Sequence, residues 1–310
     1  MKRHAGILAF VVALGACGFA AQAQQGRPVD FDKIQIRTTK LADNLYVAEA
    51  APNIGNVVFL TGPEGVLVVD TMNVQLHEKL IAAIRAAGGT GPIRFVINTH
   101  LHGDHTAGNA LFAKDGAVII AHENELKRMS SPKAGGGTAA PKEAWPTKTY
   151  SDRMTLRFNG EEIEIIHPAP AHTDDDSIVW FKHANVMHVG DLPGSIRYNN
   201  IGIDDGGTVD GMIAGGELIM KLANPRTKLV SGHLGPLAGF KEIRIQNEMT
   251  RVTRDRVAKL MAKGKTLQQI VEAKPTADFD EGRLGGSVTP ERWIGMLYAD
   301  ETRGAAKPKS

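Results

Sequence analysis

The segment THLHGDHTAGN at residues 99–109 places three histidines and an aspartate within six consecutive positions. The whole chain of 310 residues carries only 11 histidines, so three of them in one short segment indicate a chemical role. Imidazoles clustered beside a carboxylate are costly to bury unless a partner compensates them. A metal ion is the obvious partner, and the segment therefore predicts a metal site.

The spacing within this segment suggests how its side chains are divided. His100 and His102 are two residues apart, which puts both rings on one side of an extended chain. Gly103 permits a sharp turn, so Asp104 and His105 can point toward a second position. One divalent ion rarely takes four ligands from one hexapeptide, whereas two ions can share them. The pattern favours two neighbouring metal positions.

Three further candidate ligands lie at the ends of expected strands. His172 follows a predicted hairpin, Asp191 ends the strand VMHVGD, and His233 ends the strand KLVSGH. Each stands where a strand stops and a loop begins, which is the usual place for site residues on a sheet scaffold.

The elements that must position these residues follow from hydrophobic periodicity and turn signals. Short apolar runs predict strands over 44–50, 56–62, 65–70, 93–98, 117–122 and 228–233, and hairpins over 154–167 and 177–191. Helical spacing predicts helices over about 74–89, 208–222 and 240–263, and two more that start at Thr266 and Thr289. Strands precede helices in each half of the chain. This order predicts an α/β fold with two β-rich layers faced by helices, an αββα sandwich.

The N-terminus reads as an export signal. Lys2 and Arg3 precede an apolar stretch, and AQA at 21–23 fits a signal-peptidase site. We expect a signal peptide over 1–23 and a periplasmic mature protein without a membrane span. The alternatives are an uncleaved anchor, or a lipoprotein attached through Cys17, which lies in the box-like LGAC.

Composition limits the chemistry and the partners. Cys17 is the only cysteine, so cleavage after residue 23 leaves no thiol, and every metal ligand must then be nitrogen or oxygen. Loss of Lys2 and Arg3 turns 36 Lys and Arg against 34 Asp and Glu into 34 against 34. This balance gives no reason to expect nucleic acid or an anionic membrane as a partner. We expect a small-molecule substrate.

The order HLHGDH, AHTDDDS, GD and GH resembles the metallo-β-lactamase superfamily over roughly residues 42–235. The resemblance implies the same αββα sandwich. It implies a catalytic domain over 42–237, preceded by an extension over 24–41 and followed by helices over 238–310 that pack on or extend that domain.

The resemblance also implies a ligand set and a mechanism. One zinc ion would be held by His100, His102 and His172, a second by Asp104, His105 and His233, and both by a bridging Asp191. Imidazole and carboxylate ligands independently suit zinc, with iron or manganese as alternatives. A hydroxide shared by the two ions would attack an activated carbonyl, and Asp104 would orient it and pass a proton to the leaving group.

Three residues are candidates to support these ligands through hydrogen bonds: Asp70, Thr99 and Asn109. Asp70 resembles the aspartate that steadies the histidine loop in this family, although a strand-end turn residue is the plain alternative. In the run at 174–176, we expect Asp174 and Asp175 to form a solvated turn and Asp176 to buttress the strand near His172.

The expected activity is hydrolysis of an activated carbonyl, with a β-lactam amide as the leading substrate. Lactone, ester or thioester hydrolysis is the alternative, and a metal-dependent redox enzyme of the sulfur-dioxygenase or diiron type is an alternative of another class. Gly194 stands where the commonest β-lactamase subclass has a carboxylate-binding lysine. Arg197 and Tyr198 are the candidate substitutes as substrate contacts. The loops 51–56, 129–148 and 192–207 would select the substrate.

Overall fold

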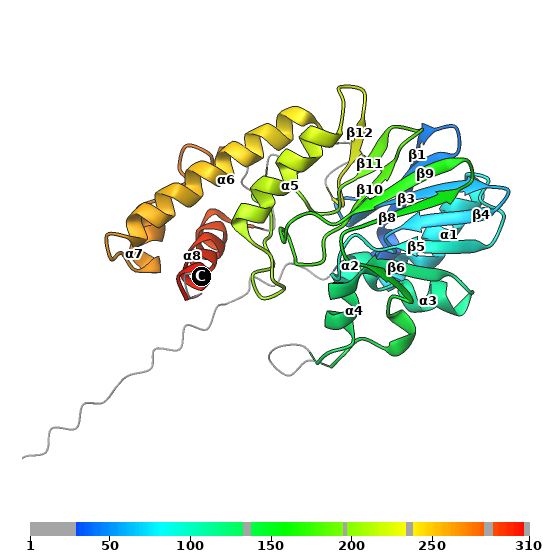
Figure 1. Ribbon diagram of the computed structural model, residues 1–310, viewed down its shortest axis with the longest axis horizontal. Helices are drawn as coiled ribbons and strands as arrows, with labels where there is room; N and C mark the ends of the chain where they lie inside the picture. Colours follow the sequence, from blue (N-terminus) through cyan, green and yellow to red (C-terminus); the bar gives the residue numbers. More distant parts are fainter. Residues whose placement is uncertain (1–28, 133–137, 195–196, 234–237, 282–287, 307–310) are drawn as a thin grey trace, which may run out of the picture.

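The computed structural model describes residues 29–132, 138–194, 197–233, 238–281 and 288–306 (Figure 1). The expected signal peptide and Cys17 lie outside the described residues. Within these ranges, no helix is both long enough and apolar enough to cross a membrane.

Two sheets form the centre of the molecule. The first holds seven strands in chain order: β1 (Gln35–Ala42), β2 (Leu45–Ala51), β3 (Gly55–Gly62), β4 (Gly65–Val69), β5 (Ile93–Ile97), β6 (Val118–His122) and β7 (Lys148–Tyr150). The second has the order β12-β11-β10-β9-β8: β8 (Arg153–Phe158), β9 (Glu161–Ile166), β10 (Ile178–Phe181), β11 (Val186–His188) and β12 (Lys228–Val230). Pairing is antiparallel from β1 to β4 and parallel from β4 to β7, and β11 pairs in parallel with β12.

The sheet begins earlier than the pattern indicated. Residues 35–41, expected in an N-terminal extension, belong to β1, which pairs with β2. The sequence QIRTTKLA is polar because β1 is an edge strand whose side chains are mostly exposed. The strand therefore has no hydrophobic alternation from which it could be predicted.

Helices cover both outer faces (Figure 1). On the seven-stranded sheet, α1 (His77–Ala86) and α3 (Asn109–Lys114) share one apolar cluster with β-strand residues such as Val68 and Val96. On the five-stranded sheet, α5 (Val209–Leu222), α6 (Phe240–Met261), α7 (Leu267–Glu272) and α8 (Pro290–Ala306) form another. A third cluster, which includes Ile97 and Val179, fills the space between the sheets. These three apolar layers confirm the expected αββα sandwich.

Candidate metal centre

Loops at the ends of β5, β9, β11 and β12 carry the candidate ligands to one edge of the sandwich. After β5 the chain runs through Thr99 into the histidine segment, where His102 precedes the short helix α2 (Gly103–Thr106). His172 follows β9, Asp191 follows β11 and His233 follows β12. The buried strands thus fix the backbone from which each side chain projects.

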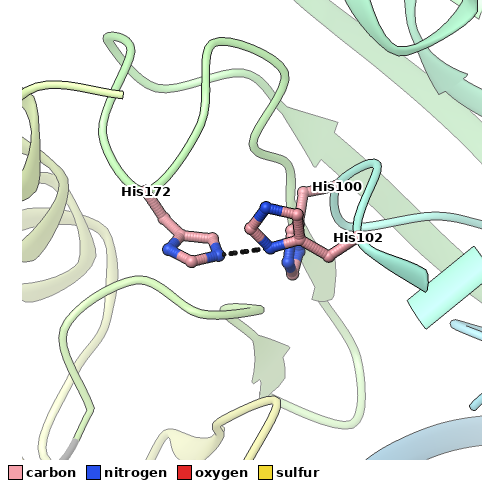
Figure 2. Close-up of side chains that lie close together, drawn as sticks. All are labelled: His100, His102 and His172. Carbon is pink, nitrogen blue, oxygen red and sulfur yellow. Dashed lines mark hydrogen bonds between the residues drawn. The ribbon is translucent and has the colours of Figure 1, made fainter. Parts of the chain in front are cut away.

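The structure brings all seven candidate ligands together. Three groups each have ligand atoms within 4.8 Å of one another: His100, His102 and His172; His100, His105 and Asp191; and Asp104, His105 and His233. Figure 2 shows the first group, in which His172 Nε2 lies 2.9 Å from His102 Nδ1.

Asp191 lies between the two ends of this cluster. Its Oδ2 is 3.7 Å from His172 Nε2 and 3.5 Å from His233 Nε2, and its Oδ1 is 3.6 Å from His105 Nε2. His233 Nε2 is also 3.2 Å from Asp104 Oδ2. A carboxylate in this position can serve ions at both ends.

Two buried atoms indicate that a cation fits here. Among the described residues, His100 Nε2 and Asp191 Oδ1 have no hydrogen-bond partner. Such atoms are costly to leave unpaired in a protein interior. A set of imidazole nitrogens and carboxylate oxygens at these separations matches the ligand preference of zinc, so the residues present fit such an ion.

Burial and neighbouring charges shift the pKa values of the candidate histidine ligands in both directions. Burial, together with four neighbouring histidines, holds the pKa of His100 well below its ordinary value. Burial likewise lowers the pKa of His172 to about 4, which leaves a neutral imidazole. For His105 burial also lowers the pKa, but the carboxylates of Asp70, Asp191 and Asp104 outweigh it and raise the value to about 10. The three neighbouring carboxylates thus favour the protonated form of His105.

The outward-facing nitrogen of each histidine has its own partner, which fixes how the ring is turned. The pairs are His100 with Thr99 Oγ1 at 3.1 Å, His102 with Asp205 Oδ2 at 3.2 Å, His105 with Asp70 Oδ2 at 2.8 Å, His172 with the Asn200 carbonyl at 2.8 Å and His233 with the Asn53 carbonyl at 3.3 Å.

Asp70 contacts both the histidine loop and one ring of the cluster. Its Oδ1 accepts from the Thr99 amide at 2.7 Å, and its Oδ2 accepts from the Thr99 hydroxyl at 2.8 Å. The same Oδ2 lies 2.8 Å from His105 Nδ1. Asp70 holds a left-handed backbone conformation with φ of 68°, which a non-glycine residue adopts at a cost.

Asn109 has a different place from the one expected. Its amide exchanges hydrogen bonds with Asn98 and donates to the Ala144 carbonyl. These bonds brace the backbone before Thr99, but they reach none of the seven candidate ligands. Asn109 therefore supports the loop rather than a ring.

The contact of Asp205 with His102 could not be predicted from the sequence, because Asp205 follows no motif and lies 103 residues from His102. Arg128 stands 3.8 Å from its carboxylate and pairs with both oxygens of Asp174, at 2.6 and 2.7 Å. Asp174 is thus ion-paired, and Asp175 is fully buried, which corrects the expectation of a solvated turn. Asp176 is buried too, and it accepts from the amide and hydroxyl of Thr173 beside His172.

Two glycines beside the cluster allow close approach. A Cβ on Gly232 would collide with Asp191 Oδ1 and would lie 2.9 Å from His105 Cε1. Gly190 has φ of +55°, and a Cβ there would meet Thr99 at 2.9 Å. Glycine is therefore required at positions 190 and 232, directly before the candidate ligands Asp191 and His233, because the packing leaves no room for a Cβ.

Tyr198 and Arg197 lie on the loop that follows Asp191. Tyr198 is buried, stacks on Trp293 and donates its hydroxyl to Asp280 at 2.7 Å. Arg197 is half-buried, and its carbonyl accepts from Gln246. Tyr198 thus packs in the core, against the expectation that it contacts substrate, whereas a substrate contact by Arg197 stays a prediction.

Two cavities open beside the cluster within the part of the chain that the structure describes. The larger, of about 860 Å³, is lined by His102 together with charged residues such as Lys127 and Arg128. The smaller, of about 620 Å³, is lined by Asp104 and His233. Both include Gly103 and Ala107, so they meet at the histidine segment.

A family model described as the metallo-beta-lactamase superfamily matches residues 50–233. The chain belongs to this superfamily. Its fold is that of a metallohydrolase, and its His and Asp groups are placed to hold metal.

Curated relatives of this superfamily member match it in part. The 2,4-dinitroanisole O-demethylase subunit alpha of Nocardioides sp. is 28% identical over 134 residues, 43% of this chain and 39% of that protein. The metallo-beta-lactamase type 2 of Elizabethkingia meningoseptica is 25% identical over 189 residues, 58% of this chain and 68% of that enzyme. The hydroxyacylglutathione hydrolase of a Polaromonas species is 33% identical over 96 residues, 31% and 35% of the two chains.

Solved structures share the fold. A metallo-beta-lactamase from Pontibacter korlensis aligns with a TM-score of 0.59 at 17% identity, over 70% of this chain and 99% of that one. The sec-alkylsulfatase Pisa1 from Pseudomonas sp. aligns with a TM-score of 0.63 at 14% identity, over 89% of this chain and 52% of that one.

Proposed function

We propose that this protein is a dizinc hydrolase that adds water across an activated carbonyl, with a β-lactam amide as the leading specific substrate. One observation carries the proposal: Asp191 Oδ2 lies 3.7 Å from His172 of one ligand group and 3.5 Å from His233 of another, and two cavities meet beside these groups. Open space beside the ligands is what a catalytic metal site needs and a structural one lacks.

Zinc ions in these sets would supply Lewis acidity and make a water molecule acidic enough to attack near neutral pH. Asp104 is the residue of this chain suited to handle the proton. Its side chain is 37% exposed and lines the smaller cavity. Contacts with His233 and His105 hold its pKa well below the ordinary value despite burial, so it is a carboxylate. It can accept a hydrogen bond from the attacking water and pass a proton to the leaving group.

Lactone, ester or thioester hydrolysis is the second candidate. It is favoured by the aspartate at 191 and glycine at 194, and by the 33% identity to a hydroxyacylglutathione hydrolase. The redox alternative has no support among the relatives named above.

The deciding experiment measures zinc, iron and manganese in the purified protein and follows hydrolysis of a chromogenic cephalosporin in the same sample. Two zinc ions per chain and turnover that a chelator abolishes would support the lactamase proposal. Two zinc ions without turnover would move the proposal to thioesters, esters and lactones, assayed next. A single bound iron ion, or no bound metal, would overturn it.

We also propose export with cleavage after Ala23, on the strength of the charged, apolar and small-residue order at the N-terminus. Expressed from its full sequence, the periplasmic protein should begin at Gln24 by intact mass. A lipidated N-terminus at Cys17, or an intact Met1, would overturn this proposal.

A further inference from the structure

Two of the candidate ligands are held by one loop. The carbonyl of Asn200 lies 2.8 Å from His172 Nδ1, and Asp205 Oδ2 lies 3.2 Å from His102 Nε2. We call residues 200–207, which contain both partners, the support loop. Partners of this kind fix how a ligand histidine is turned, so the orientation of both rings depends on where the support loop lies.

The support loop lies between β11 and α5 and contains neither helix nor strand, so neighbouring segments must fix its position. One neighbour is the segment that carries His172. The Gly202 amide donates to the His172 carbonyl at 2.8 Å, and the Asp174 amide donates to the Asp205 carbonyl at 3.0 Å. The other neighbour is the C-terminal helix α8.

Arg303, near the end of α8, contacts the support loop on both sides of Asp205. Its Nη1 donates to the Ile203 carbonyl at 2.7 Å, and its Nη2 donates to the Gly207 carbonyl at 2.5 Å. These carbonyls belong to the second residue before Asp205 and the second residue after it. A guanidinium is planar and holds its N–H donors in a fixed arrangement, so bonds to two carbonyls restrict the turn between them.

Asp300, also on α8, holds this guanidinium in place. Its Oδ1 accepts from Arg303 Nη2 at 2.8 Å, and its Oδ2 accepts from the amide of Val209, the first residue of α5, at 2.9 Å. The side chains of Asp300 and Arg303 are only 18% and 31% exposed. Arg303 is therefore anchored at the end of the support loop rather than free in solvent.

The ligand group that contains His233 is supported from other segments. His105 has Asp70, which follows β4, and His233 has the carbonyl of Asn53, which lies between β2 and β3. These segments belong to the seven-stranded sheet, whereas α8 covers the five-stranded one. Helix α8 also lies beyond residues 50–233, the part of the chain that the family model matches. Its contacts with the support loop therefore bear on one ligand group and not equally on both.

We propose that Arg303 is a positioning residue for His102, because it fixes the turn that carries Asp205, and Asp205 fixes the ring of His102. Loss of Arg303 weakens the metal ion at the ligand group that contains His102 and spares the ion at the group that contains His233. This inference rests on the proposed function, which supplies the two ions.

The test titrates the metal-free protein with zinc in competition with a chromophoric chelator, which gives a dissociation constant for each ion and requires no turnover. Arg303→Met removes the donors and keeps a long unbranched side chain. It should weaken one ion by about tenfold, the lower end of the usual effect of losing a partner behind a ligand histidine, because Arg303 acts through Asp205. The other ion should bind as in the wild type.

A conservative variant keeps the test open if Arg303→Met does not fold. Arg303→Lys retains the positive charge but offers a single nitrogen in place of the fork that bonds both carbonyls. It should weaken the same ion by a smaller factor than Arg303→Met does.

A double-mutant cycle and a matched control locate the effect. Asp205→Ala removes the partner of His102 directly, so Arg303→Met should cause no further loss of affinity in that background. Arg256 on α6 likewise donates to a backbone carbonyl and to a carboxylate, that of Asp278, which lies after α7. Arg256→Met should therefore bind both ions as the wild type does.

The outcomes separate this inference from the proposed function. If the wild type binds two zinc ions and the Arg303 variants weaken both equally, or neither, the positioning role is overturned and the dizinc centre stands. The same holds if Arg303→Met causes its full loss in the Asp205→Ala background. A wild-type protein that binds one zinc ion, or none, would overturn the proposed centre and this inference with it.

Discussion

At the scale of single residues, the centre depends on side chains with two roles. One atom of each ring faces the cluster, and another atom of the same ring is held by a partner outside it. Each of the five candidate histidine ligands directs one ring nitrogen into the cluster, while its other nitrogen has a partner. Asp191 and Asp70 are the carboxylates whose removal separates these two roles, because Asp191 lies inside the cluster and Asp70 behind it.

Asp191→Ala should lower the metal content and abolish hydrolysis, because the Asp191 carboxylate approaches histidines at both ends of the cluster. Metal analysis of the purified variant and its turnover of the wild-type substrate check this. Asp210→Ala, which removes an exposed carboxylate on α5, is the control and should keep both properties. Full activity of Asp191→Ala with two ions bound would contradict the assignment.

Asp70→Asn should lower metal affinity or activity by about 10- to 100-fold, the usual effect of losing a carboxylate behind a ligand histidine. Asparagine is the informative replacement because it tolerates the left-handed backbone at this position, whereas alanine would add strain. Competition with a chromophoric chelator gives the metal affinity. Wild-type affinity together with wild-type activity would reduce Asp70 to a turn residue.

At the scale of elements, α4 (Glu123–Met129) carries a carboxylate that the metal centre does not use. Glu125 is fully buried, and neither of its oxygens has a hydrogen-bond partner within the described residues. Burial, with the nearby carboxylates of Asp175 and Asp70, raises the pKa of Glu125 well above its ordinary value of 4.5. The folded chain therefore favours the protonated acid more than the unfolded chain does.

This difference predicts a pH dependence of stability. As pH rises above 4.5, the unfolded glutamate ionises first, so the wild type loses stability up to the raised folded-state pKa. Glu125→Gln lacks this loss. Its free energy of unfolding, relative to the wild type, should rise between pH 5 and pH 8 by about 1.4 kcal/mol for each unit of pKa difference within that window.

Urea denaturation of both proteins at the two pH values measures the change. Glu123→Gln, which alters an exposed carboxylate on the same helix, should leave the pH dependence as it is. A parallel pH dependence in Glu125→Gln and the wild type would show that Glu125 does not carry the effect.

At the scale of the whole molecule, the C-terminal helices pack against the loop that supports the site. Trp293 on α8 stacks on Tyr198 and donates to the Thr253 hydroxyl of α6 at 3.0 Å. Arg292 donates to the Asn200 side chain, and the Asn200 carbonyl is the partner of His172. We therefore expect α6, α7 and α8 to unfold together with the sandwich.

Trp293→Ala should lower the free energy of unfolding by about 3–5 kcal/mol, because it empties a fully buried site and leaves the Thr253 hydroxyl without this donor. Denaturation followed by circular dichroism and by metal release should give one coincident transition. Glu291→Ala, two residues away and exposed, should change stability by less than about 0.5 kcal/mol. If Trp293→Ala released its metal at the same denaturant concentration as the wild type, the helices would be an independent unfolding unit.

The amino-acid sequence by itself determined the αββα order and the seven residues that meet at the centre. It could do so because the periodicity of strands and helices is local. The candidate ligands His100, Asp191 and His233 also lie at the ends of strands that this periodicity predicts. The glycines before Asp191 and His233 were part of the same signal, since close packing leaves no room for a Cβ.

Only the tertiary structure decided which side chains face the centre and which are buried elsewhere. Asp205 reaches His102 across 103 residues, Tyr198 turns into the core beneath Trp293, and Lys79 holds the N-terminal segment beside the smaller cavity. Strand β1 likewise became visible only through its pairing with β2. Contacts between distant segments depend on how whole elements pack, and no periodic pattern in the chain records that packing.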